Sequence, residues 1–314
     1  MVVTGKDIKV LSVNISKEKG TIKQPVDSIE LNELGVKSDA HAGSWHRQVS
    51  LLANESIMKF EKSAHRKINF GEFAENITTS GLVLHKTSPL DRLMIGKTEL
   101  EVTQIGKKCH GTSCAIFREV GNCVMPVEGI FARVLNGGTV KPGDLITYHP
   151  RIYKAHVITL SDRASRGEYE DRSGPKITEM VKEFFESYNN PVEFIHTIIP
   201  DNPESLRVLL DHAEDAQADF VFTTGGTGIG PRDFTPDVVR DMLDKEIPGI
   251  MESIRLKYGQ EKPNALLSRG VAGVLGNSLV YTLPGSVKAV NEYLTEIFKT
   301  MKHLVYMLHG LDTH

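Results

Sequence analysis

The sequence predicts two domains of different fold class: a mainly-β, barrel-like domain over residues 1–150 and an α/β domain over residues 151–314, whose mostly parallel sheet is flanked by helices. Three observations support this prediction. The chain of 314 residues is long enough for about two ordinary domains. Short β-rich runs separated by turns dominate the first half. In the second half, apolar runs alternate with helical segments, which is the rhythm of a parallel sheet.

In the first half, turn residues separate the β-rich runs. We expect strands in IKVLSVNIS, DSIELNEL, VSLLA and ELEVTQI, with a tight turn at the IGK that precedes ELEV. The segment NESIMKFEK is expected to form one short helix, and GGTVKPGDLITYHP a turn followed by the last strand. Many short strands with few helices are typical of a compact barrel.

In the second half, the expected strands are AHVITL, VEFIHTII, DFVFTT and LVYTL, each interpreted as a buried parallel strand. Two helix starts are predicted, because Asn202-Pro203-Glu204 and Thr235-Pro236-Asp237 each place a capping residue before a proline and an acid. An apolar stripe at steps of three and four residues predicts that the last helix packs on the sheet. The stripe consists of Val287, Val290, Leu294, Ile297, Met301, Leu304 and Leu308.

Composition and charge exclude several classes of protein. The formal net charge of −3 provides no long-range attraction to nucleic acid or to an anionic membrane. No signal peptide or membrane span is expected, so the protein is expected in the cytoplasm with reduced thiols. The cysteines Cys109, Cys114 and Cys123 have a spacing that fits no common zinc or iron–sulfur pattern, so a structural metal site is disfavoured.

The segment DFVFTTGGTGIGPRDFTPD is the most informative in the chain. An apolar strand runs into Thr224-Gly225-Gly226-Thr227-Gly228, and a helix is expected to start shortly afterwards. Glycines at the carboxyl end of a parallel strand let backbone N–H groups approach phosphate oxygens, and ligands of open α/β sheets bind at these strand ends. The sequence therefore predicts a phosphate-binding loop.

Two acids strengthen this prediction. Asp233 follows the loop, and Asp201 follows the expected strand VEFIHTII, so neighbouring strand ends could bring both carboxylates to one Mg²⁺ ion. Each could instead be a helix-capping acid, which is the commoner role of an isolated aspartate near a helix start. Asp162, Glu168 and Asp171 follow the first strand in a similar way.

Six ordered segments of the second half resemble the molybdopterin adenylyltransferase family: ITLSDRASRGEYEDRSGP, IIPDNPESL, TTGGTGIGPRDFTPD, IPGIMESIR, ALLSRGVAG and LVYTLPGSVKAV. The resemblance covers residues 155–308. It implies transfer of AMP from Mg-ATP to the terminal phosphate of molybdopterin, with release of pyrophosphate and no use of pyridoxal phosphate. It also implies a homotrimer.

The same resemblance implies roles for particular residues. Asp201 and Asp233 match the family's catalytic, metal-positioning acids. The remaining matched positions belong to the nucleotide-phosphate loop and to segments that line the pterin and nucleotide cleft. They are Thr224, Gly225, Gly226, Thr227, Gly228, Ser161, Ser268, Arg269, Pro284, Gly285 and Ser286.

The first half carries a second group of polar motifs. SDAHAGSWHRQVSLL contains Asp39, His41 and Arg47, and NFGEFAENITTSGL contains Glu72 and Asn76. In QIGKKCHGTSC, Cys109 follows two lysines, whose charge lowers the pKa of a thiol and favours the reactive thiolate. Cys114 and Cys123 are more simply interpreted as buried small apolar residues.

The order D-x-H-x-G, R-x-V-S-L-L, G-E-x-x-x-E-N and G-K-x-C resembles the MOSC domain over residues 7–148. The resemblance implies binding of the molybdenum cofactor or transport of sulfur on a cysteine, for which Cys109 is the candidate. The chain is thus predicted to adenylylate molybdopterin and to deliver the product to molybdenum-insertion or molybdoenzyme partners. Two alternatives stay open: a non-catalytic carrier of molybdopterin, and an unrelated nucleotide phosphohydrolase.

Overall fold

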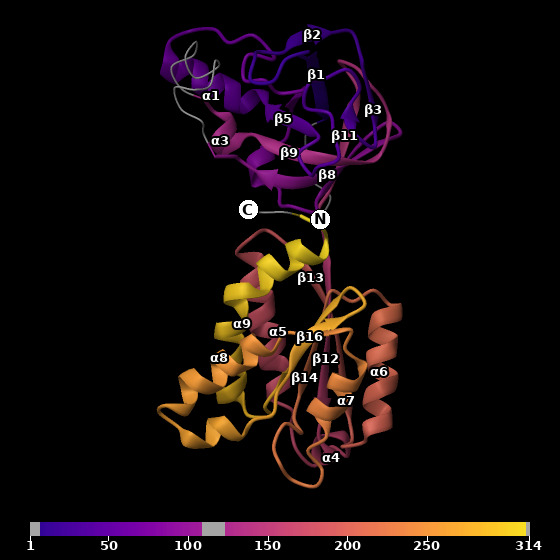
Figure 1. The fold of residues 1–314 in the computed structure, drawn as a ribbon, viewed down its shortest axis with the longest axis vertical. Coiled ribbons are helices and arrows are strands. Elements are labelled where there is room, and N and C mark those ends of the chain that lie inside the picture. The colour runs from indigo at the N-terminus through magenta and orange to yellow at the C-terminus, as the bar shows by residue number, and fades with distance from the viewer. Residues whose placement is uncertain (1–6, 109–122, 312–314) are drawn as a thin grey trace. The chain divides into compact units, whose positions relative to one another are not determined.

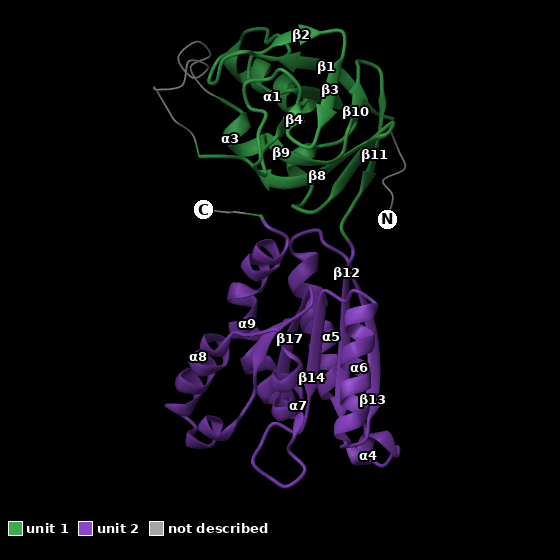
Figure 2. Cartoon of the chain, turned by 45° about the vertical axis from the view of Figure 1, so that its right-hand side comes forward, with its two compact units in different colours: residues 1–151, 311–314 green, residues 152–310 purple. Residues whose placement is uncertain are grey.

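The computed structural model describes residues 7–108 and 123–311. The chain divides into two compact units, one that runs to Arg151 and also takes in Leu311, and one from Ile152 to Gly310 (Figure 2). No helix in the described part of the chain is both long and apolar enough to cross a bilayer.

A closed β-barrel forms the core of the N-terminal unit (Figure 1). Seven strands of the described residues form the ring in the order β1-β6-β5-β9-β8-β7-β11, and β11 pairs back with β1. These strands are β1 (Ile8–Ile15), β5 (Val49–Ala53), β6 (Ile77–Ser80), β7 (Arg92–Ile95), β8 (Thr98–Ile105), β9 (Ile130–Asn136) and β11 (Leu145–His149). Their inward side chains, such as Val10, Leu51 and Leu100, are fully buried, so the barrel interior is a packed core.

Shorter elements complete this unit. β2 (Gln24–Val26) pairs antiparallel with β1. A separate small sheet is formed by β3 (Ile29–Asn32), β4 (Gly35–Val36) and β10 (Gly138–Val140). Helix α1 (Asn54–Ala64) packs through Ile57 and Phe60 onto a second apolar cluster, and α3 (Met125–Glu128) and the 3₁₀ turn η1 (Leu84–Lys86) are single turns. The expected turn at IGK is confirmed: it joins β7 to β8, and Gly96 has a φ of +58°.

A six-stranded sheet organises the C-terminal unit, in the order β13-β12-β14-β17-β16-β15. β12 (Tyr153–Leu160), β13 (Val192–Ile199), β14 (Phe220–Thr224) and β17 (Ser278–Leu283) are parallel to one another. β16 (Ala272–Leu275) and β15 (Lys245–Glu246) add antiparallel strands. The sheet is therefore mostly parallel, as predicted.

Helices cover both faces of this sheet (Figure 1). On one face, α6 (Pro203–Asp215) and α7 (Thr235–Met242) pack through Leu206, Leu210 and Val238. On the other lie α5 (Ser173–Glu186) and α9 (Val287–Leu308). The remaining helical elements are α4 (Asp162–Ser165), α8 (Pro248–Gly259) and η3 (Pro263–Leu267).

Three details differ from the sequence-based expectations. β13 is an edge strand rather than a buried one, and Ile195 and Ile198 are 58% and 41% exposed. Thr235 does not cap α7: it is the first helical residue, and Phe234 precedes it without a side-chain capping bond. The stripe of α9 is buried in its middle, but Val287 is exposed, since it lies at the solvent-facing start of the helix.

Candidate functional site

The strand order creates a crevice at the carboxyl edge of the C-terminal sheet. From β12 the chain passes through α4 and α5 to β13 on one side, then returns through α6 to β14 on the other side of β12. The loops that follow β12 and β14 therefore diverge, and ligands of open α/β sheets bind where loops diverge in this way. A pocket of about 390 Å³ lies there, and Ser161, Thr224, Gly285 and Ser286 line it. Four residues predicted from sequence are thus brought together.

The glycine loop after β14 depends on left-handed backbone. Gly225 and Gly226 have φ values of +102° and +63°, and a Cβ on Gly225 would lie 2.4 Å from the carbonyl oxygen of Leu160. The Gly225 N–H donates to the Leu283 carbonyl at 3.1 Å, so it is not available to a ligand. The N–H groups of Gly226, Thr227 and Gly228 have no acceptor among the described residues. Three adjacent donors in a strand-to-helix loop suit phosphate oxygens.

Side chains on neighbouring strands fix the walls of the crevice. The Ser161 hydroxyl accepts from the Ala164 N–H and caps α4, and the Ser286 hydroxyl caps α9 by accepting from the Ala289 N–H. The Thr224 hydroxyl donates to the Pro284 carbonyl at 3.1 Å, which ties the end of β14 to the turn before α9.

Arg269 ties the glycine loop to helix α7. Its guanidinium donates to the Gly228 carbonyl at 2.7 Å, to the Asp233 carbonyl, and to both carboxylate oxygens of Asp237 at 2.8 and 2.9 Å. Ser268, the residue before it, is held through its carbonyl by Arg255. Because its donors are directed at protein acceptors, Arg269 shapes the loop in this structure rather than offering a free cation.

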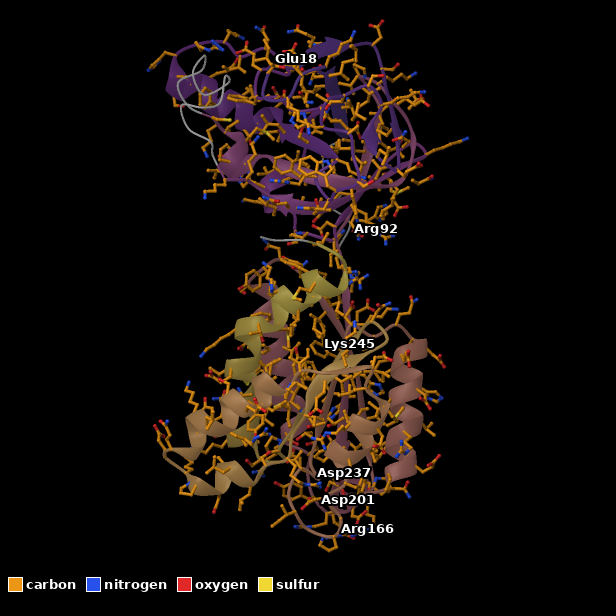
Figure 3. All side chains as sticks on the ribbon, viewed as in Figure 1. Glu18, Arg92, Arg166, Asp201, Asp237 and Lys245 are labelled. Atoms are coloured by element: carbon orange, nitrogen blue, oxygen red, sulfur yellow. The ribbon has the colours of Figure 1, made fainter. Side chains whose placement is uncertain are left out.

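Asp201 and Asp233 are held in different ways. The Asp201 N–H donates to the Asp162 carboxylate at 3.0 Å, and Arg232 donates to the same carboxylate at 2.9 Å. Asp233 accepts the Gly230 N–H at 2.8 Å and closes its own loop. Asp201 lies at the same end of the unit as Asp237, which binds Arg269 (Figure 3).

The carboxylates of this region do not form a preassembled metal site among the described residues. Within residues 7–108 and 123–311, no group of three or more His, Cys, Asp or Glu side chains is placed to hold a metal. One carboxylate oxygen of Asp201 and one of Asp233 nevertheless lack a protein partner among the described residues. Mg²⁺ is commonly held by one or two carboxylates together with substrate phosphates, so this donor set is compatible with it.

Asp171, which the sequence analysis noted only as an acid after the first strand, lines the same pocket, and the His196 beside it was not predicted. The Asp171 carboxylate accepts from the Thr159 hydroxyl at 2.7 Å and from the first amides of α5, and His196 Nε2 lies 3.1 Å away. Burial raises the pKa of Asp171, but these hydrogen bonds and His196 outweigh it and hold the pKa below its usual value. Tyr169 also lines the pocket. The motif DRSGP marked Asp171, but only the pairing of β12 with β13 brings His196 to it.

A second pocket, of about 150 Å³, lies in the N-terminal unit. Three residues of the predicted motifs line it together with others: His41, Arg47 and Asn76. Asp39 lies behind it in an ion pair with Lys23, and both side chains are 1% exposed. Glu72 does not line this pocket and instead pairs with Arg66.

Lys23 was not predicted, because an isolated lysine in a turn-rich segment has no signal of burial. Of the cysteines, Cys109 and Cys114 lie outside the described residues, so their predicted roles stay predictions. Cys123 packs against the cluster beneath α1 but is only partly buried, rather than buried as predicted.

Comparison with known proteins identifies relatives of both halves. Residues 156–303 match a family model described as a probable molybdopterin binding domain, and residues 38–147 match the MOSC domain. A molybdopterin adenylyltransferase from Helicobacter pylori is 37% identical over 155 residues, which cover 49% of this chain and 86% of that protein. Another from Pyrococcus furiosus is 37% identical over 163 residues, covering 49% and 92%. The molybdopterin biosynthesis enzyme MoaB from Thermus thermophilus is similar in structure, with 36% identity, a TM-score of 0.45, and coverage of 50% and 97%.

Proposed function

Because the chain belongs to the molybdopterin adenylyltransferase family, we propose that its C-terminal half transfers AMP from ATP to the terminal phosphate of molybdopterin and releases pyrophosphate. The observation that carries the proposal is the loop Gly226–Gly228, whose three N–H groups have no acceptor among the described residues. Support comes from the position of the loop, which follows Thr224, a lining residue of the pocket, at the end of the sheet where open α/β folds commonly bind ligands.

The chemistry asks the protein for positioning and charge neutralisation. The attacking phosphate is already a nucleophile near neutral pH, so no strong general base is required. The loop amides would hold the triphosphate, and Asp201 and Asp233 would orient the metal through their free carboxylate oxygens. A bound Mg²⁺ supplies positive charge that offsets the repulsion between the two anions. The Asp171–His196 pair would hold the pocket wall beside Ser161 and Thr224.

The test is a paired assay of the whole chain with Mg-ATP and molybdopterin, in which adenylyl-molybdopterin is followed by chromatography. An Asp233→Asn variant should lower the rate by roughly 10²–10³-fold, the effect of losing one key electrostatic contact. Asp241→Asn is the matched control, because Asp241 is an exposed aspartate of α7 whose carboxylate pairs with Arg207. The control should keep the parent rate.

Two results would contradict the proposal and identify its rivals. Binding of molybdopterin without adenylylation would make the chain a carrier. Splitting of ATP at the same rate with and without molybdopterin would make it a phosphohydrolase.

For the N-terminal half, we propose that the MOSC domain binds the molybdenum cofactor made from the product or carries sulfur on Cys109, before transfer to molybdenum-insertion or molybdoenzyme partners. A fused domain keeps a labile intermediate close to its next binding site. Cytoplasmic location is part of the same proposal. Replacing Cys109 with serine should abolish any protein-bound persulfide, measured by mass spectrometry of the intact chain.

We also propose a homotrimer that buries the edge strand β13. Ile195 and Ile198 present apolar side chains on an edge strand whose outer side has no strand partner among the described residues, which is a surface that natural proteins usually cover. Analytical ultracentrifugation should give three times the mass of the chain, and Ile195→Glu should reduce it to a monomer. A monomeric parent protein would contradict this assembly.

A further inference from the structure

The small pocket of the N-terminal unit has aromatic and cationic walls. Trp45 and Arg47 precede β5, Lys107 follows β8, and Phe131 belongs to β9. Ser50 and Asn76 form the polar side of the pocket, where the Asn76 amide oxygen accepts the Ser50 N–H and hydroxyl at 3.1 and 2.9 Å. These hydrogen-bonding groups already pair with each other within the protein, so the cationic side chains of Arg47 and Lys107 are the groups that remain to bind a ligand.

The two cations lie over aromatic rings rather than beside acids. The Arg47 guanidinium carbon lies 4.8 Å from the centre of the Trp45 ring, and Lys107 Nζ lies 5.8 Å from that of Phe131. Neither side chain makes an ion pair with any residue the structure describes. Arg47 Nε is buried and has no hydrogen-bond partner among those residues. A buried donor left unpaired is costly, which indicates that an acceptor fills this position.

The acids around the pocket do not neutralise these cations. The charge of Asp39 is already matched by Lys23, and His41 Nδ1 lies 3.4 Å from both groups. Burial raises the pKa of Asp39, but the hydrogen bonds from His41 and Lys23 outweigh it and hold the pKa below its usual value. Glu75 is fully buried, and burial raises its pKa, which favours the neutral form. Neither Asp39 nor Glu75 lines the pocket, so Arg47 and Lys107 face it without an acidic side chain among the lining residues.

We propose that this pocket binds a small tetrahedral oxoanion. Its volume of about 150 Å³ suits four oxygen atoms, each comparable to a water molecule at roughly 30 Å³. A pterin would need a pocket of roughly 300 Å³ or more. The guanidinium of Arg47 can donate two parallel hydrogen bonds to such an anion, and Lys107 supplies a second charge. The ligand is either a free oxoanion such as molybdate, or the phosphate end of a larger molecule whose remainder stays outside. The inference does not depend on adenylyl transfer by the other half.

The chain contains its own probe, because Trp45 is the single tryptophan. The whole protein is titrated with sodium molybdate, sulfate or phosphate at constant ionic strength, with sodium chloride as reference. Tryptophan fluorescence and calorimetry are both recorded. Arg47→Gln and Lys107→Gln are the test variants. Arg92→Gln is the matched control: it removes one cation of the same unit that is paired with Glu99 and does not line the pocket (Figure 3). Urea unfolding of each variant verifies that it is folded.

We expect saturable binding of a tetrahedral dianion and none of chloride. Arg47→Gln should weaken it on the order of tenfold to a hundredfold, the usual effect of losing a charged hydrogen bond. Lys107→Gln should weaken it less, and Arg92→Gln should leave it unchanged. If molybdopterin displaces molybdate, the ligand is the phosphate end of a larger molecule. If molybdopterin does not displace molybdate, the ligand is a free oxoanion. Equal responses to chloride and to the oxoanions, or binding that folded Arg47→Gln and Lys107→Gln both retain in full, would overturn the proposal.

Discussion

Replacing Lys23 with methionine should destabilise the N-terminal unit by about 3–5 kcal/mol, the usual cost of breaking a buried ion pair from one side. The magnitude follows from burial, because the side chains of Lys23 and Asp39 are each 1% exposed. Methionine keeps most of the aliphatic stem but removes the charge, so the Asp39 carboxylate stays buried beside the His41 imidazole, whose Nδ1 lies 3.4 Å away, and accepts from two backbone donors. These are the N–H groups of Ser16 and His41, each at 3.0 Å.

Urea unfolding followed by the fluorescence of Trp45 measures this loss in the N-terminal unit alone, since the chain has one tryptophan. With a slope of about 2 kcal/mol per molar urea, the midpoint should fall by roughly 2 M. Lys37→Met is the matched control. Lys37 and Glu30 form a pair of the same type with side chains 60% and 61% exposed, and such pairs contribute about 0–1 kcal/mol.

If the urea midpoint of Lys23→Met is no lower than that of Lys37→Met, Lys23 and Asp39 are not a buried ion pair on which the stability of the unit depends. The double variant Lys23→Met, Asp39→Leu should recover part of the lost stability, because it removes the uncompensated charge. Recovery should be incomplete, since leucine leaves the N–H groups of Ser16 and His41 without their acceptor.

Two further variants test the crevice of the C-terminal unit. Gly225→Ala should lower the free energy of unfolding by about 2–4 kcal/mol, because its Cβ would lie 2.4 Å from the Leu160 carbonyl oxygen in a left-handed backbone. Gly167→Ala is the control, because Gly167 has a φ of +72° but a Cβ there would have no atom within 4 Å. It should cost about 1 kcal/mol, and thermal unfolding measures both losses. Equal losses would contradict the clash. Asp171→Asn should cost about 1 kcal/mol at neutral pH, through weaker acceptance from Thr159 and from α5. Since the folded pKa of Asp171 is lowered, its contribution is present above the unfolded pKa and is lost as the pH falls through the folded value. The difference from the parent chain should therefore shrink in acid, and a constant difference would contradict the role of its charge.

Local features of both units were predictable because their causes lie within a few residues. The runs DFVFTT and LVYTL form β14 and β17, in which every residue is buried. Asn202 caps α6, because its side chain accepts the Ser205 N–H one turn ahead. Glycine at positions 225 and 226 signalled a loop that needs left-handed backbone, and both residues have positive φ.

Features that depend on distant segments were not predictable in this way. VEFIHTII has the same apolar character as the buried strands, yet β13 lies at the edge, since strand order is decided by how α5 and α6 pack on opposite faces. Thr235 has the local pattern of a helix cap, but its N–H donates to the Gly226 carbonyl and the helix begins at Thr235 itself.

The sequence by itself determined the fold class of each half, the position of the glycine loop and the family, because hydrophobic period, glycine placement and ordered motifs are properties of contiguous residues. Only the tertiary structure decided which charges meet. Lys23 reaches Asp39, Asp201 meets Asp162 rather than standing alone, and His196 reaches Asp171 from the neighbouring strand. The physical reason is that an ion pair or hydrogen bond needs approach within a few ångströms, and chain folding sets that distance between residues far apart in sequence.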